Sequence, residues 1–468
     1  MEGSKLNSWL IQGGIGLLLT GLVYLLGFQI VRSDFPALLF HYGLFFIAYI
    51  GICHYTKKQN KIIFFIVLGI FLRFILIFTI PNLSDDLYRF IWDGRLLIQG
   101  INPFDHLPSY YIEQNSQIKG LTRALYNQLN SPNYFTIYPP VNQVIFALAT
   151  WLFPDSIWGS SMVMKSFLFT FEVGSIFLIV QLLKHFQLPA KNVLFYALNP
   201  LIILEITGNL HFEGAMVFFL LLAIWLIGVK GKWVLSAIAF ALSVASKLLP
   251  LMFLPLFIGR LGIYKAKAIT ARNEPLINSS IFPLWKGLWS EKFQIWKLLN
   301  WKRIIFYFSI IGLTLVLLFI PLFNGVFFSN FGDSLNLYFQ KFEFNGSLSY
   351  FFRWVGFQIK GYNIIGTIGP ILAIVALLGI LALTLFEKKV NWQTLFERML
   401  FAICFYLFSS ATVHPWYVSL PVAFCLFTRF RFPILWSGLI FLTYINYSYG
   451  EYWENLWIVG IELSLIHI

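Results

Sequence analysis

The stretch KIIFFIVLGIFLRFILIFTIPNLSDDLYRFIWDGR, residues 61–95, joins a long apolar run to a dense group of charges. Its first part is long and apolar enough to cross a membrane as a helix. Three aspartates and two arginines follow within eleven residues, and the group begins with the adjacent pair Asp85 and Asp86. A charge held against a bilayer costs about 2.5–3.5 kcal/mol on insertion scales, so such charges are usually functional or paired. The stretch therefore predicts a membrane protein with a functional site where this span ends.

The composition supports the same class of protein. Hydrophobic residues make up 59% of the 468 residues and charged residues only 11%. These proportions exclude a soluble enzyme and indicate an all-α polytopic membrane protein. The net charge of +13 comes largely from lysines and arginines in short loops beside apolar runs, so we expect membrane lipids as partners and no nucleic acid. The three cysteines have no spacing typical of disulfides or metal sites, and no cofactor is expected.

Apolar runs of about 20 residues mark the expected spans. Several runs are short for a full crossing, so we expect about 11 to 14 spans in a single polytopic domain, residues 1–468. The first run is expected to be a retained membrane helix rather than a removed signal peptide. The runs lie at 9–31, 36–53, 62–80, 137–153, 161–184, 192–207, 214–229, 233–258, 304–324, 363–386, 399–413, 416–428, 434–448 and 455–467.

The lysine and arginine bias predicts which loops face the cytoplasm. The basic loop 260–303, rich in tryptophan, is expected there as an interfacial segment that binds anionic lipids, and Lys388 and Lys389 are expected on the same side. The loop 81–136 is then extracytoplasmic, and its length of over 50 residues suggests structure or function. If both runs after this loop crossed the membrane, the basic residues that follow would lie on the extracytoplasmic side, against the charge bias. This favours partial insertion of 137–153.

Polar side chains suited to catalysis gather on the predicted outer face. They combine carboxylates that can act as general bases with cations that can bind an anion such as phosphate. The candidate site residues are Asp85, Asp86, Arg89, Asp93, Tyr138, His211, Glu213, Lys247, Arg353, His414 and Tyr417.

The acid pair is expected at the start of a helix that lies on the membrane surface, with Ser84 as its N-cap. Capping by the first turn explains one acid, but adjacent residues point about 100° apart, so both need not cap. We therefore assign a function to at least one of the two. Arg89 and Asp93 are spaced i, i+4 and could simply pair along the helix.

The remaining candidates also have structural alternatives. His211 and Glu213 lie in a polar turn at a membrane mouth, where two potential ligands are too few for a metal site. Lys247 lies inside a largely apolar run, at the expected outer tip of a short helical hairpin, and either snorkels or meets a phosphate. His414 could be an ordinary interface residue, and Arg353 an ordinary loop residue. Two further acids in or near apolar runs, Glu172 and Glu205, receive no role.

With these residues in this order, the chain resembles the GT-C superfamily of membrane glycosyltransferases, and in particular bacterial polyprenyl-phosphate-mannose-dependent mannosyltransferases. The resemblance rests on an ordered set of motifs that extends from about residue 80 to 417. They are SDDLYRF (84–90), WDGR (92–95), GINPF (100–104), YPP (138–140), NP (199–200), GNLHFE (208–213), SKLLP (246–250) and HPWY (414–417).

The resemblance implies a GT-C helical bundle whose large first extracytoplasmic loop carries interfacial helices. It also implies a multi-pass enzyme of the bacterial inner membrane, with its active site facing the periplasm or the cell exterior. Such enzymes move a sugar, here mannose, from a polyprenyl-phosphate donor to a hydroxyl with inversion, and commonly without a metal. Asp85 or Asp86 would then be the general base, with Lys247, His211, Arg353 and His414 around the donor phosphate. The acceptor, whether glycan, lipid or protein, stays open.

Two other functions compete with this reading. A secondary transporter or lipid-carrier flippase would place charges near the midplane on broken helices and often has two related halves. No such halves are apparent in the sequence, and the charges concentrate on one face. A non-catalytic scaffold would not need an acid pair beside a group of cations. Both comparisons favour the enzyme.

Overall fold

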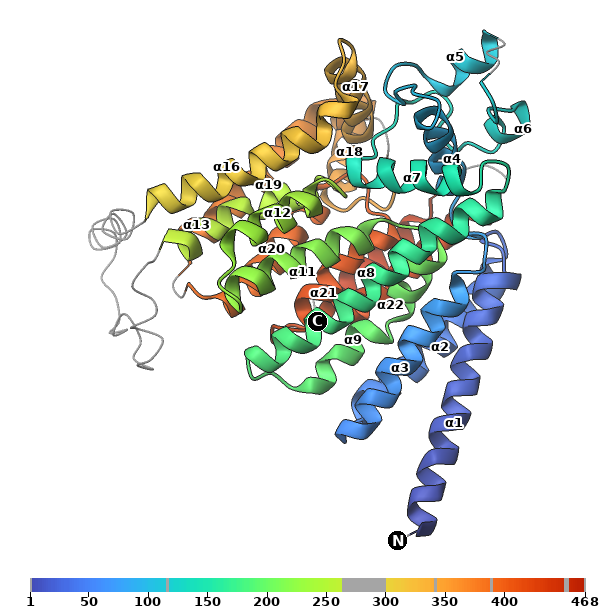
Figure 1. Cartoon of the computed structure of the whole chain (residues 1–468), viewed down its shortest axis with the longest axis vertical. Helices are drawn as coiled ribbons and strands as arrows, with labels where there is room; N and C mark the ends of the chain where they lie inside the picture. The colour runs from blue at the N-terminus through green and yellow to red at the C-terminus, as the bar shows by residue number, and fades with distance from the viewer. Residues whose placement is uncertain are drawn as a thin grey trace.

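The structure, a computed structural model, describes residues 2–114, 118–262, 300–340, 343–387, 390–449 and 454–466. Most of the predicted basic segment 260–303 lies outside these residues, as do Lys388 and Lys389. The described chain is helical and contains no β-strand, only an isolated bridge between Phe344 and Thr412. The all-α class is therefore confirmed (Figure 1).

Every apolar run of the sequence corresponds to one or more helices, and further helices form in the segments between the runs. In the first half these are α1 (Glu2–Tyr24), η1 (Leu25–Gln29), α2 (Phe35–Tyr55), α3 (Gln59–Leu76), α4 (Asp86–Leu97), α5 (Pro108–Glu113), α6 (Arg123–Tyr126), α7 (Pro140–Leu152), α8 (Ile157–His185), η2 (Ala190–Val193), α9 (Leu194–Ala197), α10 (Pro200–Ile202), η3 (Ile203–Gly208) and α11 (Glu213–Gly228).

The second half continues the same pattern, and here the longest helices are α16 and α19. The elements are α12 (Trp233–Val244), η4 (Leu249–Phe253), α13 (Leu254–Gly262), α16 (Trp301–Phe319), η5 (Ile320–Leu322), α17 (Phe327–Gln340), α18 (Leu348–Lys360), α19 (Ile365–Leu385), α20 (Trp392–Ser409), η6 (Pro415–Val418), α21 (Ser419–Cys425), α22 (Phe432–Leu439), η7 (Ile440–Tyr447) and α23 (Leu456–Ile466).

Six helices among the described residues are long and apolar enough to cross a membrane, and a bent pair raises the number to seven. The chain is thus a multi-pass membrane protein. The range of 11 to 14 is reached only if the shorter apolar helices are counted as well, because several expected spans are short or broken. The expected span 137–153 is α7, with 13 residues. It lies crosswise at the α4 end of the molecule (Figure 1).

Local sequence explains where several helices begin. Asp34, Asn199 and Asn391 accept backbone N–H bonds at the starts of α2, α10 and α20. A proline occupies the first turn of α2, α7, α10 and α22, where no intrahelical donor is needed. For α4 the expectation was one residue off. The N-cap is Asp85, while the Ser84 hydroxyl accepts from the Asp86 N–H at 3.3 Å.

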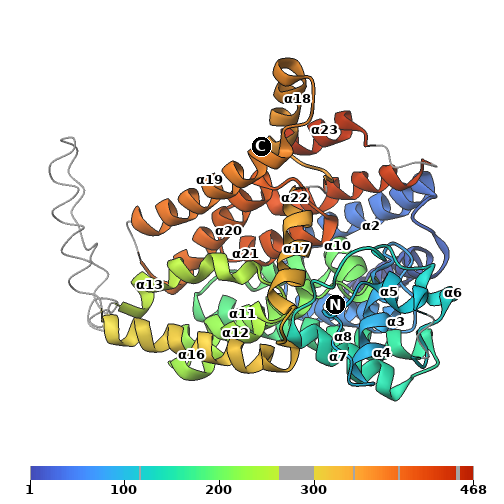
Figure 2. The same ribbon diagram turned by 90° about the horizontal axis from the view of Figure 1, so that it is seen from above.

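The loop 81–136 folds against the bundle with its own apolar core. Leu87, Phe90 and Ile91 of α4 are almost fully buried and pack with Phe146 of α7. The two helices cross so closely that a Cβ on Gly94 would lie 2.4 Å from the Phe146 carbonyl oxygen. The apolar face of α4, expected to rest on the membrane surface, therefore packs inside the protein. Figure 2 shows α4 to α7 gathered in one part of the molecule, away from α18 and α23.

A buried ion pair ties α3 to α8 inside the bundle. Arg73 Nε donates to Glu172 Oε2 at 3.0 Å, and both side chains are fully buried. The same guanidinium donates to the carbonyls of Ala197 at 2.6 Å and Tyr196 at 3.2 Å. The Tyr196 hydroxyl completes the group by donating to Glu172 Oε1 at 2.6 Å. Glu172 thus has a structural role that the sequence did not reveal.

This pair generates a stability prediction. Glu172→Gln leaves the guanidinium buried without its counter-charge, so we expect a loss of about 3–5 kcal/mol in unfolding free energy. The double variant Arg73→Met/Glu172→Met should recover part of this loss because neither charge remains. Thermal unfolding in lipid nanodiscs measures the effect, with the exposed Lys302→Met as the control. A double variant less stable than Glu172→Gln would contradict this account.

Candidate active site

The acid pair lies where α3 gives way to α4, and each acid has a different partner. Asp85 forms an ion pair with Arg32, which follows η1 at the start of the loop to α2. Both side chains remain partly exposed, 39% for Asp85 and 31% for Arg32. Asp86 instead accepts a hydrogen bond from the neutral amide of Asn130 at 2.7 Å. The two carboxylates therefore sit in different electrostatic surroundings although they are adjacent in the chain.

Arg89 and Asp93 form the i, i+4 pair that the sequence allowed. Arg89 Nε donates to Asp93 Oδ1 at 2.8 Å, and both residues are buried. Arg89 also donates to the carbonyls of Ser131 at 3.2 Å and Tyr134 at 2.8 Å. Gln143 of α7 donates to the other Asp93 oxygen at 3.2 Å. These bonds fix the loop over α4, so the observed contacts of this pair are structural.

His211 lies at a sharp break in the chain. The segments Pro200–Gly208 and Glu213–Gly228 meet at an angle of 110°, and the turns of η3 before the break are π-helical. Leu210 has a φ of 65°, a left-handed value that costs a bulky residue about 1–3 kcal/mol and persists only where the surroundings enforce it. Such outliers and π-helical turns cluster at functional sites.

Glu205 of η3 organises the polar atoms of this break. His211 Nδ1 lies 2.9 Å from the Glu205 carbonyl oxygen and 3.2 Å from Glu205 Oε2. Asn209 Nδ2 donates to Oε2 at 3.4 Å, and the hydroxyl of Tyr444 donates to Oε1 at 2.7 Å. Asn209 Oδ1 in turn accepts from the Leu83 N–H at 3.2 Å, which connects the break to the loop that carries the acid pair.

Glu213 and Lys247 bring a second pair of charges to the same place. Lys247 Nζ lies 2.8 Å from Glu213 Oε1, and Nζ is 5.6 Å from the ring centroid of Tyr417. The Glu213 side chain is fully buried, whereas 22% of the Lys247 side chain is exposed. The lysine therefore neither snorkels alone nor lies free; it keeps an accessible side beside a buried carboxylate.

His414 belongs to an aromatic stack that reaches His211. The Trp416 ring lies with its centroid 3.7 Å from that of His211 and 4.4 Å from that of His414. Burial above all, with His211 and Lys247 nearby, lowers the pKa of His414 to about 3. Its ring is therefore neutral at physiological pH, and Lys247 is the stronger candidate to bring positive charge to an anion here.

Tyr138 lies within electrostatic reach of both groups. Its ring packs against Phe90 with centroids 4.8 Å apart. Burial first and the charge of Asp86 second raise the pKa of Tyr138 well above its usual value, and Glu213 adds to the effect. The Tyr138 hydroxyl thus stays protonated and lies within the electrostatic influence of both Asp86 and Glu213.

Arg353 does not join this group through any described ion pair or ring contact. It donates to Glu343 Oε2 at 2.8 Å and lies over the Tyr350 ring, 4.0 Å from its centroid. These residues line a separate cavity of about 510 Å³ together with Trp354 and Phe357. The structure therefore brings the other candidates together around the α3–α4 junction and the helix break, and leaves Arg353 beside them with its own partners.

Sequence reasoning missed several residues of the site. Glu205 had one usable signal, since an acid within an apolar run is a functional candidate by default. Arg32 had none, because an arginine at the end of a span usually marks only topology. Arg32 also lines an open cavity of about 560 Å³ beside the acid pair, and this cavity offers amide, hydroxyl and aromatic side chains. Its lining residues are Val31, Arg32, Ser33, Asn82, Asn446, Tyr447 and Tyr449.

A group of three or more His, Cys, Asp or Glu side chains able to hold a metal ion is not found in the parts of the chain that the structure describes. The arrangement instead offers carboxylates, a lysine, two imidazoles and a cavity with polar walls. This set can accept a proton and bind an anion within one region. Both functions are needed to transfer a group from a phosphate to a hydroxyl.

Comparison with known proteins supports one class of enzyme. Residues 36–261 match the model of the MptA_B family, described as alpha-(1->6)-mannopyranosyltransferase, N-terminal domain. This segment contains the acid pair, the helix break and Lys247. Searches among curated proteins and among solved structures gave no match. Over residues 36–261 the chain is therefore similar to the MptA_B family of mannosyltransferases, and this similarity supports a membrane glycosyltransferase.

Proposed function

We propose that the chain is an inverting GT-C mannosyltransferase that moves mannose from a polyprenyl-phosphate donor to a hydroxyl of a glycan. The observation that carries this proposal is the gathering of Lys247, His211 and His414 at the helix break, which the hydrogen bond from Leu83 to Asn209 joins to the loop that carries the acid pair. The phosphate of a lipid-linked donor lies at the membrane boundary and carries no nucleotide. Cations at this boundary can therefore bind the phosphate without a separate nucleotide site.

In the proposed step, the acceptor oxygen attacks the anomeric carbon and the carbon–oxygen bond to the phosphate breaks. The bonding electrons stay on the phosphate, and the acceptor proton passes to Asp85 or Asp86. Asp86, whose described side-chain donor is neutral, is ready to accept this proton. Asp85 becomes available when Arg32 turns away, which its partial exposure permits.

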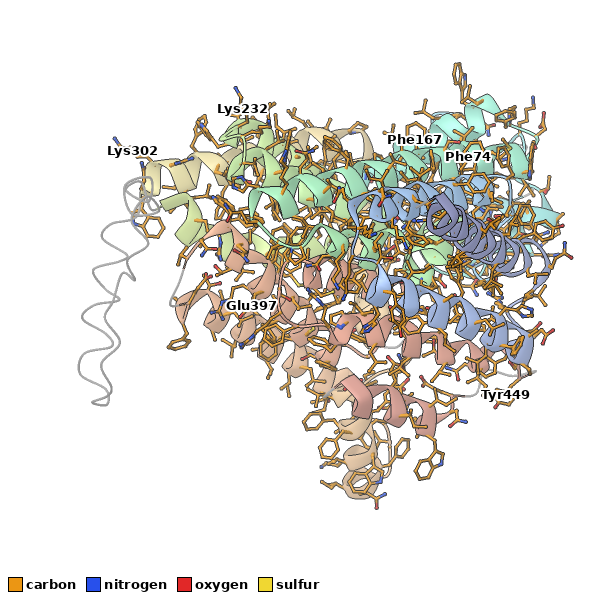
Figure 3. The ribbon with its side chains drawn as sticks, turned by 90° about the horizontal axis from the view of Figure 1, so that it is seen from below. Phe74, Phe167, Lys232, Lys302, Glu397 and Tyr449 are labelled. Carbon is orange, nitrogen blue, oxygen red and sulfur yellow. The ribbon has the colours of Figure 1, made fainter. Side chains whose placement is uncertain are left out.

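The proposed location is the bacterial inner membrane, with the site on the extracytoplasmic side. The charge bias of the sequence supports this orientation, because Lys232 and the segment that begins α16 are basic. In Figure 3, Lys232 and Lys302 lie at the opposite end of the molecule from Tyr449. Tyr449 lines the cavity beside the acid pair, so the site is at the end away from these lysines.

The first test removes the acids one at a time. Substitution of whichever acid accepts the proton, by Asp85→Asn or Asp86→Asn, should reduce turnover by about 10²- to 10⁴-fold, because the amide cannot take the proton. Binding of the polyprenyl-phosphate donor should persist. Transfer of radiolabelled mannose by purified protein measures turnover, with the exposed Asp155→Asn as the control. A lipid-carrier flippase, which the broken helix at His211 could also serve, would move donor across vesicles and give no product in any variant.

The second test concerns the donor phosphate. Lys247→Met should weaken donor binding roughly 10- to 100-fold, as expected for the loss of a hydrogen bond to a charged group. Because this substitution strands Glu213, the double variant Glu213→Gln/Lys247→Met should restore thermal stability but not donor affinity. Lys232→Met, which changes an exposed lysine, is the matched control. Donor affinity that follows stability across these variants would argue against a phosphate contact.

The third test concerns the acceptor. We place the glycan in the cavity beside Arg32, because aromatic faces with amides and hydroxyls suit sugar rings. Ser33→Ala and Tyr449→Ala should raise the KM for a manno-oligosaccharide about 10-fold, while the KM for the donor stays unchanged. Steady-state kinetics with each substrate varied separately measures both constants, with the exposed Tyr55→Ala as the control. An equal change in both constants would speak against an acceptor site.

A further inference from the structure

The helix break contains a histidine with one paired and one unpaired ring nitrogen. His211 Nδ1 faces two acceptors of Glu205, the carbonyl oxygen at 2.9 Å and Oε2 at 3.2 Å. Since an acceptor requires a donor opposite it, Nδ1 carries the proton. The other nitrogen, Nε2, is buried and has no hydrogen-bond partner among the described residues.

The Glu205 carboxylate is fully occupied by donors and held in place. Besides His211 it accepts from the Tyr444 hydroxyl at 2.7 Å and from Asn209 at 3.4 Å. Both its side chain and that of Tyr444 are buried. The carboxylate faces the imidazole ring and can balance a positive charge on it.

The His211 ring has little freedom to turn. One face stacks on Trp416 at 3.7 Å between centroids and 16° between planes. The backbone before it is constrained by the left-handed Leu210, and its own N–H bonds back to Glu205. An unpaired nitrogen on a fixed and buried ring is costly unless a ligand completes it.

We propose that Glu205 is a positioning residue that holds the proton on Nδ1 of His211 and thereby presents Nε2 to the phosphate of the lipid-linked donor. This inference rests on the proposed function. When the ring carries both protons, Nε2–H donates to the phosphate oxygen that leaves the anomeric carbon, and Glu205 balances the charge of the ring. This hydrogen bond leaves both protons on the ring. The proton of the acceptor hydroxyl still passes to the acid pair.

The charges around the ring are consistent with an anion at Nε2. Glu205 is the acid on its Nδ1 side, and Tyr444 adds a hydroxyl behind it. On the Trp416 side stand the neutral His414 and, beyond it, Lys247 with its partner Glu213. A phosphate there would meet Lys247 and Nε2–H together, which is a stronger site than either alone.

Kinetics of the full chain in nanodiscs test this role. Glu205→Gln keeps the shape but loses the charge, and we expect kcat to fall about 10- to 100-fold while the KM for the acceptor is unchanged. The loss of activity at high pH should begin at a lower pH than in the wild type. Tyr444→Phe should give a smaller change in the same direction. Tyr49→Phe removes a buried hydroxyl that donates to a backbone carbonyl instead, and it should leave the pH profile unchanged.

A double variant separates positioning from general destabilisation. If Glu205 acts through His211, then Glu205→Gln/His211→Asn will be no slower than His211→Asn alone. If the two losses multiply, or if Glu205→Gln changes the rate without moving the pH profile, the role through His211 is wrong. Thermal unfolding of Glu205→Gln beside Tyr49→Phe reports any purely structural effect.

Binding to a probe keeps the inference separate from the proposed function. In protein labelled with ¹⁵N-histidine, a short isoprenyl phosphate should shift the His211 Nε2 resonance in the wild type, and the shift should be lost in Glu205→Gln. His211→Asn assigns the signal. If no lipid-linked sugar is turned over but this shift occurs, the proposed reaction fails and the phosphate contact stands. An unchanged Nε2 signal in an active enzyme overturns the inference.

Discussion

The carboxylate of Glu205 is the interaction on which the rest of the site depends. A helix broken within an apolar bundle exposes backbone and side-chain polar groups that water cannot satisfy there. Glu205 resolves this by accepting from Tyr444, Asn209 and His211, which joins η7 to both sides of the break. Asn209 then reaches Leu83, just before the acid pair. The orientation of His211 and the chain just before the acid pair are consequently tied to one buried carboxylate.

A second group of buried polar contacts fixes where the third helix ends. Lys165 of α8 donates to the carbonyls of Leu76 at 3.1 Å and Thr79 at 2.8 Å. Arg73, one turn earlier, binds Glu172 of the same helix. These bonds satisfy carbonyls that α3 leaves free at its end. The chain therefore enters the α3–α4 junction from a rigid support, as a site needs if its carboxylates are to keep their geometry.

Local features of the sequence were sufficient for the class of fold and for naming most residues that gather at the candidate site. Apolar runs located the long apolar helices of the bundle, because length and hydrophobicity are local properties. The i, i+4 pairing of Arg89 with Asp93 could be read for the same reason. Whether the apolar face of α4 packs against lipid or against protein could not be predicted, since both environments favour the same side chains. Its partner, α7, reads in sequence as another short span.

Partners far apart in the chain explain what the sequence did not reveal. Arg32 and Asp85 are 53 residues apart, and Tyr444 and Glu205 are 239 apart. No periodicity relates such positions, so the roles of Arg32 and Glu205 became visible only in three dimensions. The two acids that received no role, Glu172 and Glu205, each accept from at least two buried donors. Acids in apolar segments are best interpreted by asking which donors could surround them.

The ion pair between Arg32 and Asp85 has a consequence for side reactions. A membrane enzyme that holds an activated sugar beside a carboxylate risks transferring that sugar to water. An arginine paired with Asp85 occupies one of the two oxygens that would otherwise polarise a water molecule. Because Arg32 also lines the adjacent cavity, a molecule that fills this cavity meets the arginine first. If Asp85 is the base of the proposed reaction, the idle enzyme would be protected from hydrolysing its donor, and the arrival of the second substrate would itself remove the protection.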